Sequence, residues 1–91
     1  MNINKYSNPS IVMKKEKELN LNPIQLSSRK DKKYMFLVPN TNKMVHFGQM
    51  GYEDYTKHHD EKRRELFRKR NNKWATAEKY SSAWLSYYLL W

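Results

Sequence analysis

Two apolar, aromatic-rich runs separated by turn-forming residues constrain the fold of this chain more than any other feature. The first run, Tyr34–Val38, reads Tyr-Met-Phe-Leu-Val, and the second, Lys43–Phe47, reads Lys-Met-Val-His-Phe and is followed by Gly48. Aromatic and β-branched residues are typical of strands. The intervening Pro39–Asn42 consists of residues that favour tight turns. The pattern therefore predicts a β-hairpin.

The faces of this hairpin follow from the alternation of side chains along a strand. Tyr34, Phe36 and Val38 share one face of the first strand, and Val45 and Phe47 share a face of the second. Two strands alone are only marginally stable in water. Segments that follow the hairpin must therefore cover one of its faces.

The size of the chain limits the core that can form. The protein has 91 residues, 38% of them hydrophobic, so it can form one small domain with a thin core, which excludes a large enclosed active site. It contains no cysteine, which excludes disulfide bonds, thiolate zinc sites and cysteine nucleophiles.

A first helix is expected to begin near Asp60 and to run to Arg70. Acidic residues stand in its first turn and basic residues in its last, as the helix dipole favours. Either Thr56 or Asp60 is a suitable N-cap, and the pair Asn71–Asn72 is a suitable end. The apolar stripe of this helix is narrow, so most of its surface must face water or an anionic partner.

A second helix is expected near the end of the sequence. Ser81 or Ser82 can cap it, and its wide apolar face carries Trp84, Leu85, Tyr88 and Leu89, with Trp91 beyond it. A face this wide is expected to cover the hairpin in part and to dock a partner in part.

The N-terminal third differs in character from the rest. It contains Pro9 and Pro23, and its apolar residues alternate in a way that favours an extended segment over a helix. The predicted fold class is therefore α+β: a small β-hairpin packed by two short helices over residues 33–91, with an extended basic arm over residues 1–32.

Positive charge is the second notable property of the chain. It carries 18 Lys and Arg against 9 Asp and Glu, a formal net charge of +9, and a dense cluster of basic residues lies in the first predicted helix. Guanidinium and ammonium groups neutralise phosphates, and aromatic rings between them stack on bases. Pairing of Glu61 with Arg64 at helical spacing would reduce the free charge of the cluster. The candidates for phosphate contact are Arg63, Arg64, Arg68, Lys69 and Arg70, with Trp74 beside them.

The histidines do not form a metal-binding pattern. His58 and His59 are adjacent, so at the start of a helix they point in directions about 100° apart, and His46 lies on a strand. The sequence holds no glycine-rich phosphate loop and no nucleophile elbow. We therefore predict a protein that is not an enzyme, with no catalytic residues, no metal site and no cofactor. The sequence also predicts no transmembrane segment, and it leaves contact with a membrane surface open.

One pattern in the chain reads Val45-His46-Phe47-Gly48, then Gly51-Tyr52-x-Asp54-Tyr55-Thr56-x-His58, then Arg63-Arg64 and the ending Trp84-Leu85 to Leu90-Trp91. This pattern resembles a small uncharacterised protein family found widely in large eukaryotic DNA viruses. The resemblance covers residues 33–91. It implies a virion or viral-factory context, with assembly in the host cytoplasm, and it implies no mechanism.

Two functions are carried forward from these features. The first is a non-enzymatic virion structural protein, a minor capsid or cement component that bridges neighbouring subunits and contacts capsid or other virion proteins. The second is a small basic nucleic-acid-binding protein that packages DNA or RNA. For the first, the expected partner contacts are Ile11, Val12, Leu21, Ile24, Trp84, Tyr88 and Trp91.

Overall fold

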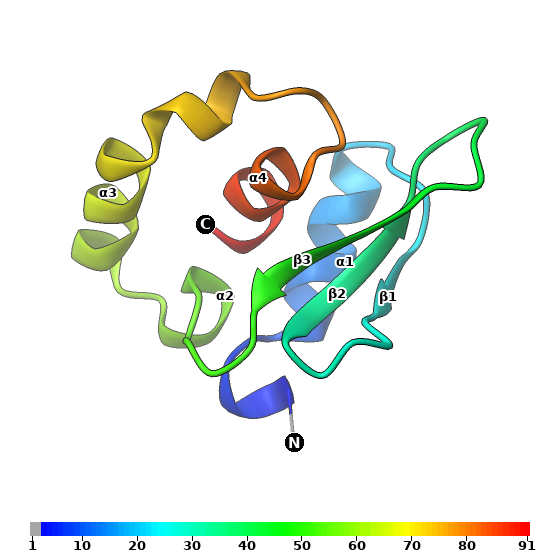
Figure 1. Ribbon diagram of the computed structural model, residues 1–91. Coiled ribbons are helices and arrows are strands. Elements are labelled where there is room, and N and C mark those ends of the chain that lie inside the picture. Colours follow the sequence, from blue (N-terminus) through cyan, green and yellow to red (C-terminus); the bar gives the residue numbers. More distant parts are fainter. Residues whose placement is uncertain (1–2) are drawn as a thin grey trace.

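The computed structural model describes residues 3–91 and contains a three-stranded antiparallel sheet (Figure 1). The strands are β1 (Ile24–Leu26), β2 (Lys32–Leu37) and β3 (Met44–Gln49), in the order β1-β2-β3. Tyr34 pairs with Phe47, and Phe36 with Val45, so the predicted hairpin is confirmed. The strand β1 extends the sheet beyond the two predicted strands.

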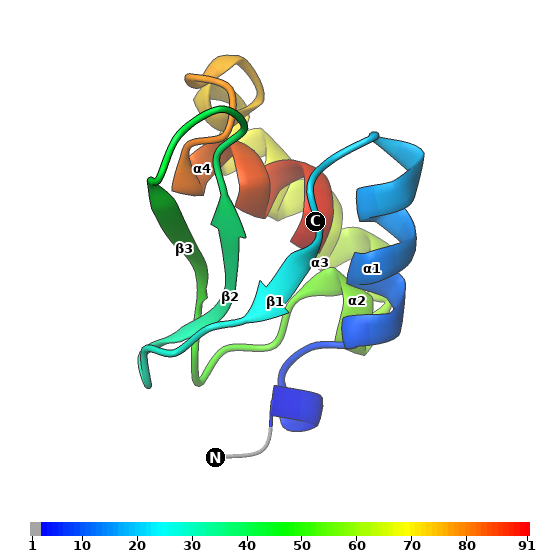
Figure 2. The ribbon, with the colours of Figure 1, turned by 90° about the vertical axis from the view of Figure 1, so that its right-hand side faces the viewer.

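One face of the sheet forms the core of the protein. Tyr34, Phe36, Val45 and Phe47 are buried on this face, as the alternation predicted. Helical segments near both ends of the chain pack against it (Figure 2), where they contribute the buried side chains Val12, Leu85, Leu89 and Leu90. The protein is therefore a two-layer α+β domain.

The predicted extended arm is wrong for residues 9–18, which form the helix α1 (Pro9–Glu18). Asn8 is its N-cap and accepts a hydrogen bond from the Ser10 amide at 3.1 Å, and Pro9 occupies the first turn. This is the position where a helix tolerates proline best, because no intrahelical donor is lost there. Asn20, with a φ of 55°, ends the helix.

The N-terminal segment belongs to the same core as the hairpin. The Glu16 carboxylate accepts a hydrogen bond from the Ile24 amide at 2.7 Å, and Ile24 pairs with Phe36 across the sheet. A short 3-10 helix, η1 (Ile3–Lys5), precedes α1. The predicted division between residues 32 and 33 therefore falls inside β2, and β1 on its N-terminal side belongs to the same sheet.

The predicted helix beginning at Asp60 is confirmed. After the short helix α2 (Tyr55–His58), Asp60 caps α3 (Glu61–Arg70) through bonds to the Lys62 and Arg63 amides at 3.0 and 3.2 Å. Such a cap contributes about 1 kcal/mol. The helix ends at Asn71, as expected.

The C-terminal segment returns over the sheet. A 3-10 helix, η2 (Asn72–Thr76), leads to α4 (Ser82–Leu85), which is continued by the π-helix η3 (Ser86–Leu90). The Ser81 hydroxyl caps α4 by accepting a bond from the Trp84 amide at 3.2 Å, as predicted. Within residues 3–91, no helix is both long enough and apolar enough to cross a membrane.

Candidate functional site

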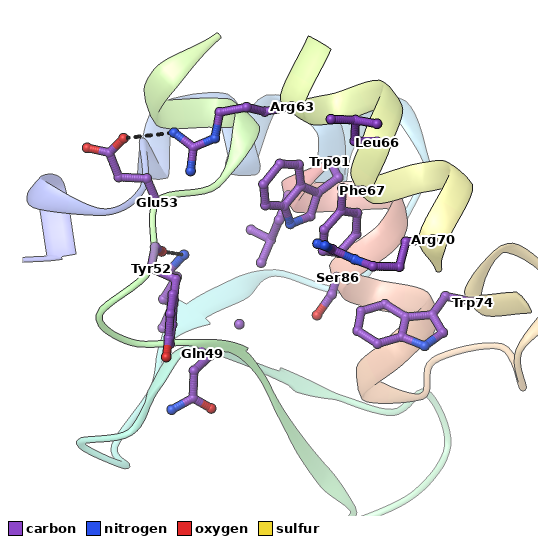
Figure 3. A pocket seen from close by; sticks show the side chains of 13 residues that line it. Gln49, Tyr52, Glu53, Arg63, Leu66, Phe67, Arg70, Trp74, Ser86 and Trp91 are labelled. Carbon is purple, nitrogen blue, oxygen red and sulfur yellow. Dashed lines mark hydrogen bonds and ion pairs between the residues drawn. The ribbon is translucent and has the colours of Figure 1, made fainter. Parts of the chain in front are cut away.

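A groove of about 530 Å³ opens between α3 and the segment that joins β3 to α2 (Figure 3). Ligand sites in proteins are typically about 300–1,000 Å³ in volume, so the groove is large enough for a nucleotide-sized group. Its lining combines aromatic, aliphatic and cationic side chains: Lys33, Gly48, Gln49, Tyr52, Glu53, Arg63, Leu66, Phe67, Arg70, Trp74, Ser86, Leu90 and Trp91.

One wall of the groove is aromatic. The Phe67 and Trp91 rings are stacked, with centroids 4.1 Å apart and an angle of 6° between their planes. Trp74 meets Phe67 edge-on, with centroids 5.6 Å apart. Tyr52 stands on the opposite side of the groove and is 70% exposed (Figure 3). The wall is held rigid by these ring contacts, whereas Tyr52 presents a ring free to meet a ligand.

Two arginines of α3 provide the positive charge of the groove. Arg63 and Arg70 lie seven residues apart, so two helical turns place both on the same face of α3. Arg63 forms an exposed ion pair with Glu53, with 3.8 Å between the nitrogen and the oxygen. Exposed pairs of this kind contribute about 0–1 kcal/mol, so a ligand can displace this one. Arg70 forms no ion pair within residues 3–91.

Arg64 and Arg68, two of the predicted phosphate contacts, do not line the groove. Both donate hydrogen bonds to the main-chain oxygen of Trp91, at 2.7 and 2.9 Å. The Arg64 guanidinium also lies over the Tyr55 ring, 4.7 Å from its centroid, and that of Arg68 lies over the Tyr87 ring at 5.1 Å. These two arginines therefore fix the C-terminal segment against α3.

The predicted phosphate contacts thus separate into two groups. Arg63, Arg70 and Trp74 meet in the groove, whereas Arg64 and Arg68 are used within the protein. Lys69 is exposed on α3 and does not line the groove. Sequence reasoning missed Gln49, Leu66 and Ser86 as lining residues. Gln49 is the last residue of β3, and nothing in the sequence distinguished it, Leu66 or Ser86 as a lining residue.

The predicted partner contacts are also divided by the structure. Val12 and Ile24 lie in the core of this chain and are not accessible to a partner. Trp91 lines the groove. The remaining four residues are half-buried: Ile11, Leu21, Trp84 and Tyr88.

The floor of the groove contains a buried ion pair. The Lys33 ammonium lies 3.1 Å from the Asp54 carboxylate and donates to the Tyr52 carbonyl at 2.6 Å. Burial lowers the pKa of Lys33, and the Asp54 charge partly opposes this shift. Because both charges are consumed inside the protein, Lys33 positions the Tyr52 loop but adds little positive charge to the groove.

A chain of hydrogen bonds continues from this pair toward the N-terminal segment. Thr56 donates to the other Asp54 oxygen, and its hydroxyl accepts the Asn8 amide at 2.9 Å. The Ser7 hydroxyl lies 3.1 Å from that of Thr56 and accepts a bond from the Tyr34 hydroxyl at 2.7 Å. The network joins α1, the sheet and α2 beneath the groove.

The histidines have separate surroundings. The His46 ring nitrogen Nδ1 lies 2.7 Å from the Ser27 hydroxyl. Nδ1 of His58 accepts the Asp60 amide at 2.9 Å, and burial, with a smaller effect of Arg63, lowers the pKa of His58. His59 ends α2 with a φ of 53°. Over residues 3–91, no three His, Asp or Glu side chains are grouped so that they could hold a metal ion.

The fold and the groove define a small α+β domain with an aromatic and cationic surface groove. Residues 23–71, just over half of the chain, match the model of the family of unknown function DUF5754, and the chain belongs to this family. The match contains the sheet, α2 and α3, but not Trp74, Ser86 or Trp91 on the other side of the groove. No curated protein and no solved structure matches the chain.

Proposed function

We propose that this protein is a non-enzymatic binding protein that holds single-stranded nucleic acid in the groove of α3. The observation that carries the proposal is the convergence of Arg63 and Arg70 with Trp74 and Tyr52 around one hollow. Arginine recognises phosphate through its planar fork of donors. Aromatic rings stack on bases of any sequence, and each stacked base contributes about 1–3 kcal/mol.

The aromatic lining of the groove favours a single strand over a duplex as its ligand. The faces of the bases are hidden inside a duplex, whereas a single strand presents them to aromatic side chains. The exposed Tyr52 ring faces the groove from one side and the Phe67–Trp91 stack from the other (Figure 3). A base inserted between these sides would place its phosphates near the arginines at the rim.

Removal of both groove arginines tests this function. We expect R63A/R70A to weaken binding of a fluorescent single-stranded oligonucleotide, measured by anisotropy, and to reduce the slope of log K against log salt by about 1.4, since each single-strand phosphate contact contributes about 0.7. W74A is expected to weaken binding about tenfold at constant salt slope.

The matched control is K62A/K69A. These lysines are exposed on the same helix, are also seven residues apart and do not line the groove, so this variant loses the same charge. We expect its salt slope to stay close to that of the wild type. Equal losses in the two double variants, or no binding by the wild type, would contradict the proposal.

A role as a virion structural protein is a second proposal. It is supported by the resemblance to a family of large DNA viruses and by the outer face of the sheet, where Leu37 and Met44 pair across β2 and β3 and are both exposed. Adjacent exposed apolar side chains are typical of contacts between proteins. In this proposal the protein resides in the virion, is assembled in the host cytoplasm or viral factory, and contacts capsid proteins through this face.

This role predicts that L37D/M44D will be lost from purified particles, because two carboxylates would be buried in the contact. Particle composition can be measured by quantitative mass spectrometry, with R63A/R70A as the control that leaves the outer face intact. Absence of the wild-type protein from particles, or full incorporation of L37D/M44D, would contradict the second proposal.

A further inference from the structure

We infer that a second basic hollow, at the turn between β1 and β2, continues the groove, so that the ligand is a chain of several nucleotides and not a mononucleotide. This inference rests on the proposed nucleic-acid function. It assigns a second phosphate-binding site to a part of the molecule distant in sequence from α3.

The hollow has a volume of about 500 Å³ and lies beside a short loop rich in lysine and arginine. Lys30 and Lys32 line it and form no ion pair within residues 3–91. Arg29 also lines it and is paired with Asp31 at 3.1 Å, both side chains being more than half exposed. Two positive charges therefore remain uncompensated here.

The hollow is next to the groove. Lys33 contributes to the lining of both. The Met50 amide donates a hydrogen bond to the Asp31 carbonyl at 2.9 Å, and Lys32 pairs with Gln49 across the sheet. Figures 2 and 3 both show the turn between β1 and β2 beside the loop that follows β3. A strand leaving the groove past Gln49 and Tyr52 would reach the free lysines.

The groove and the basic hollow have different linings, and this difference suits a polymeric ligand. The groove combines arginine with aromatic rings, which bind a phosphate and a base together. The hollow has no aromatic side chain in its lining and offers mainly charge, with Ile3, Leu26 and Met50 as its apolar part. It is therefore suited to the phosphate backbone of neighbouring nucleotides, which carries one charge per nucleotide whatever the base.

The inference is tested by comparing a dinucleotide with a ten-nucleotide single strand. For the wild type we expect the longer strand to bind at least tenfold more tightly. K30A/K32A is expected to weaken binding of the longer strand about tenfold at low salt and to reduce its salt slope by about 1.4. Binding of the dinucleotide should stay within twofold of the wild-type value, because the α3 groove is intact.

K14A/K17A is the matched control, since both lysines are exposed on α1 and line neither hollow. We expect it to leave both affinities within twofold. Equal effects of K30A/K32A and K14A/K17A, or equal affinities for the two lengths, would overturn the inference. So would a ten-residue polyglutamate peptide that competes as well as the oligonucleotide, because it would indicate an acidic protein as the partner.

The outcomes separate this inference from the proposed function. If the wild type binds neither oligonucleotide, or R63A/R70A binds like the wild type, the proposed function fails and this inference fails with it. If binding depends on Arg63 and Arg70 but not on strand length or on Lys30 and Lys32, only the second site is overturned. Circular dichroism of each variant will show that the fold is retained.

Discussion

Replacement of Asp54 by alanine is expected to lower the free energy of unfolding by about 3–5 kcal/mol, because it leaves a charged lysine buried without its partner. Lys33 and Asp54 are 3% and 1% exposed, and 3.1 Å separates their charged atoms. The substitution also removes the acceptor of the Thr56 hydroxyl, which belongs to the network that joins α2 to the N-terminal segment. Equilibrium unfolding in urea will measure the change.

A second ion pair in the same protein provides the control for Asp54. Arg29 and Asp31 also lie 3.1 Å apart, but their side chains are more than half exposed. We expect D31A to cost less than about 1 kcal/mol, because water compensates the remaining charge. D54N retains the shape of the side chain but not its charge. We expect it to show most of the loss in free energy of unfolding that D54A shows. Similar losses for D54A and D31A would show that burial does not determine the strength of the Lys33–Asp54 pair.

The hairpin could be predicted from sequence because its signal is local. Alternation along β2 and β3 predicted the buried face, and the structure places Tyr34, Phe36, Val45 and Phe47 there. The exposed turn near Asn40, which has a φ of 62°, follows from the cluster of turn-forming residues. The alternation of side chains and the turn-forming residues are visible in neighbouring positions of the sequence. The hairpin could therefore be predicted without knowledge of distant contacts.

The helix α1 was missed because its signals conflict. Pro9 and Pro23 suggested an extended segment, whereas Asn8 followed by Pro9 is also the pattern of an N-cap and a first helical residue. The helix buries only Val12 and Glu16, so its apolar periodicity is weak. Its position depends on the bond from the Ile24 amide to Glu16. That bond joins residues that lie eight positions apart in the sequence, and no local pattern predicts it.

The candidate groove could be predicted only in part, because the type of a residue does not show in which direction its side chain points. Five basic residues of α3 were equivalent candidates in the sequence, yet the packing of Trp91 divides them. Arg64 and Arg68 donate to the Trp91 oxygen, whereas Arg63 and Arg70 line the groove. The directions of the Arg64 and Arg68 side chains are set by a contact with Trp91, 27 and 23 residues further along the chain, which the sequence pattern did not contain.

The block from Val45 to His58 has a clear structural role in this protein. Val45 and Phe47 belong to the core, and Asp54 and Thr56 belong to the buried network. Gly48 has a φ of 82°, and an added Cβ would lie 3.0 Å from a Leu90 carbon, so this position requires glycine. The block that carries the resemblance therefore specifies the scaffold of the groove more than its ligand contacts.

Replacement of Phe36 by alanine is expected to lower the free energy of unfolding by about 3–5 kcal/mol, the usual cost of removing a buried aromatic side chain and leaving a cavity. Phe36 is 0% exposed on β2 and packs against the Tyr80 ring at 5.4 Å between centroids. Domains of this size have about 5–15 kcal/mol of stability in total, so F36A should unfold at much lower urea concentration.

The adjacent residue of the same strand is the matched control for Phe36. Leu37 lies on the opposite face of β2 and is 40% exposed, so truncation to alanine removes apolar area that water already reaches. We expect L37A to cost about 1 kcal/mol or less. A loss for L37A as large as that for F36A would mean that the outer face of the sheet is covered in solution, which is the result that the virion proposal would predict for an assembled form. The pair F36A and L37A thus measures which face of the sheet the protein buries by itself and which face it leaves for a partner.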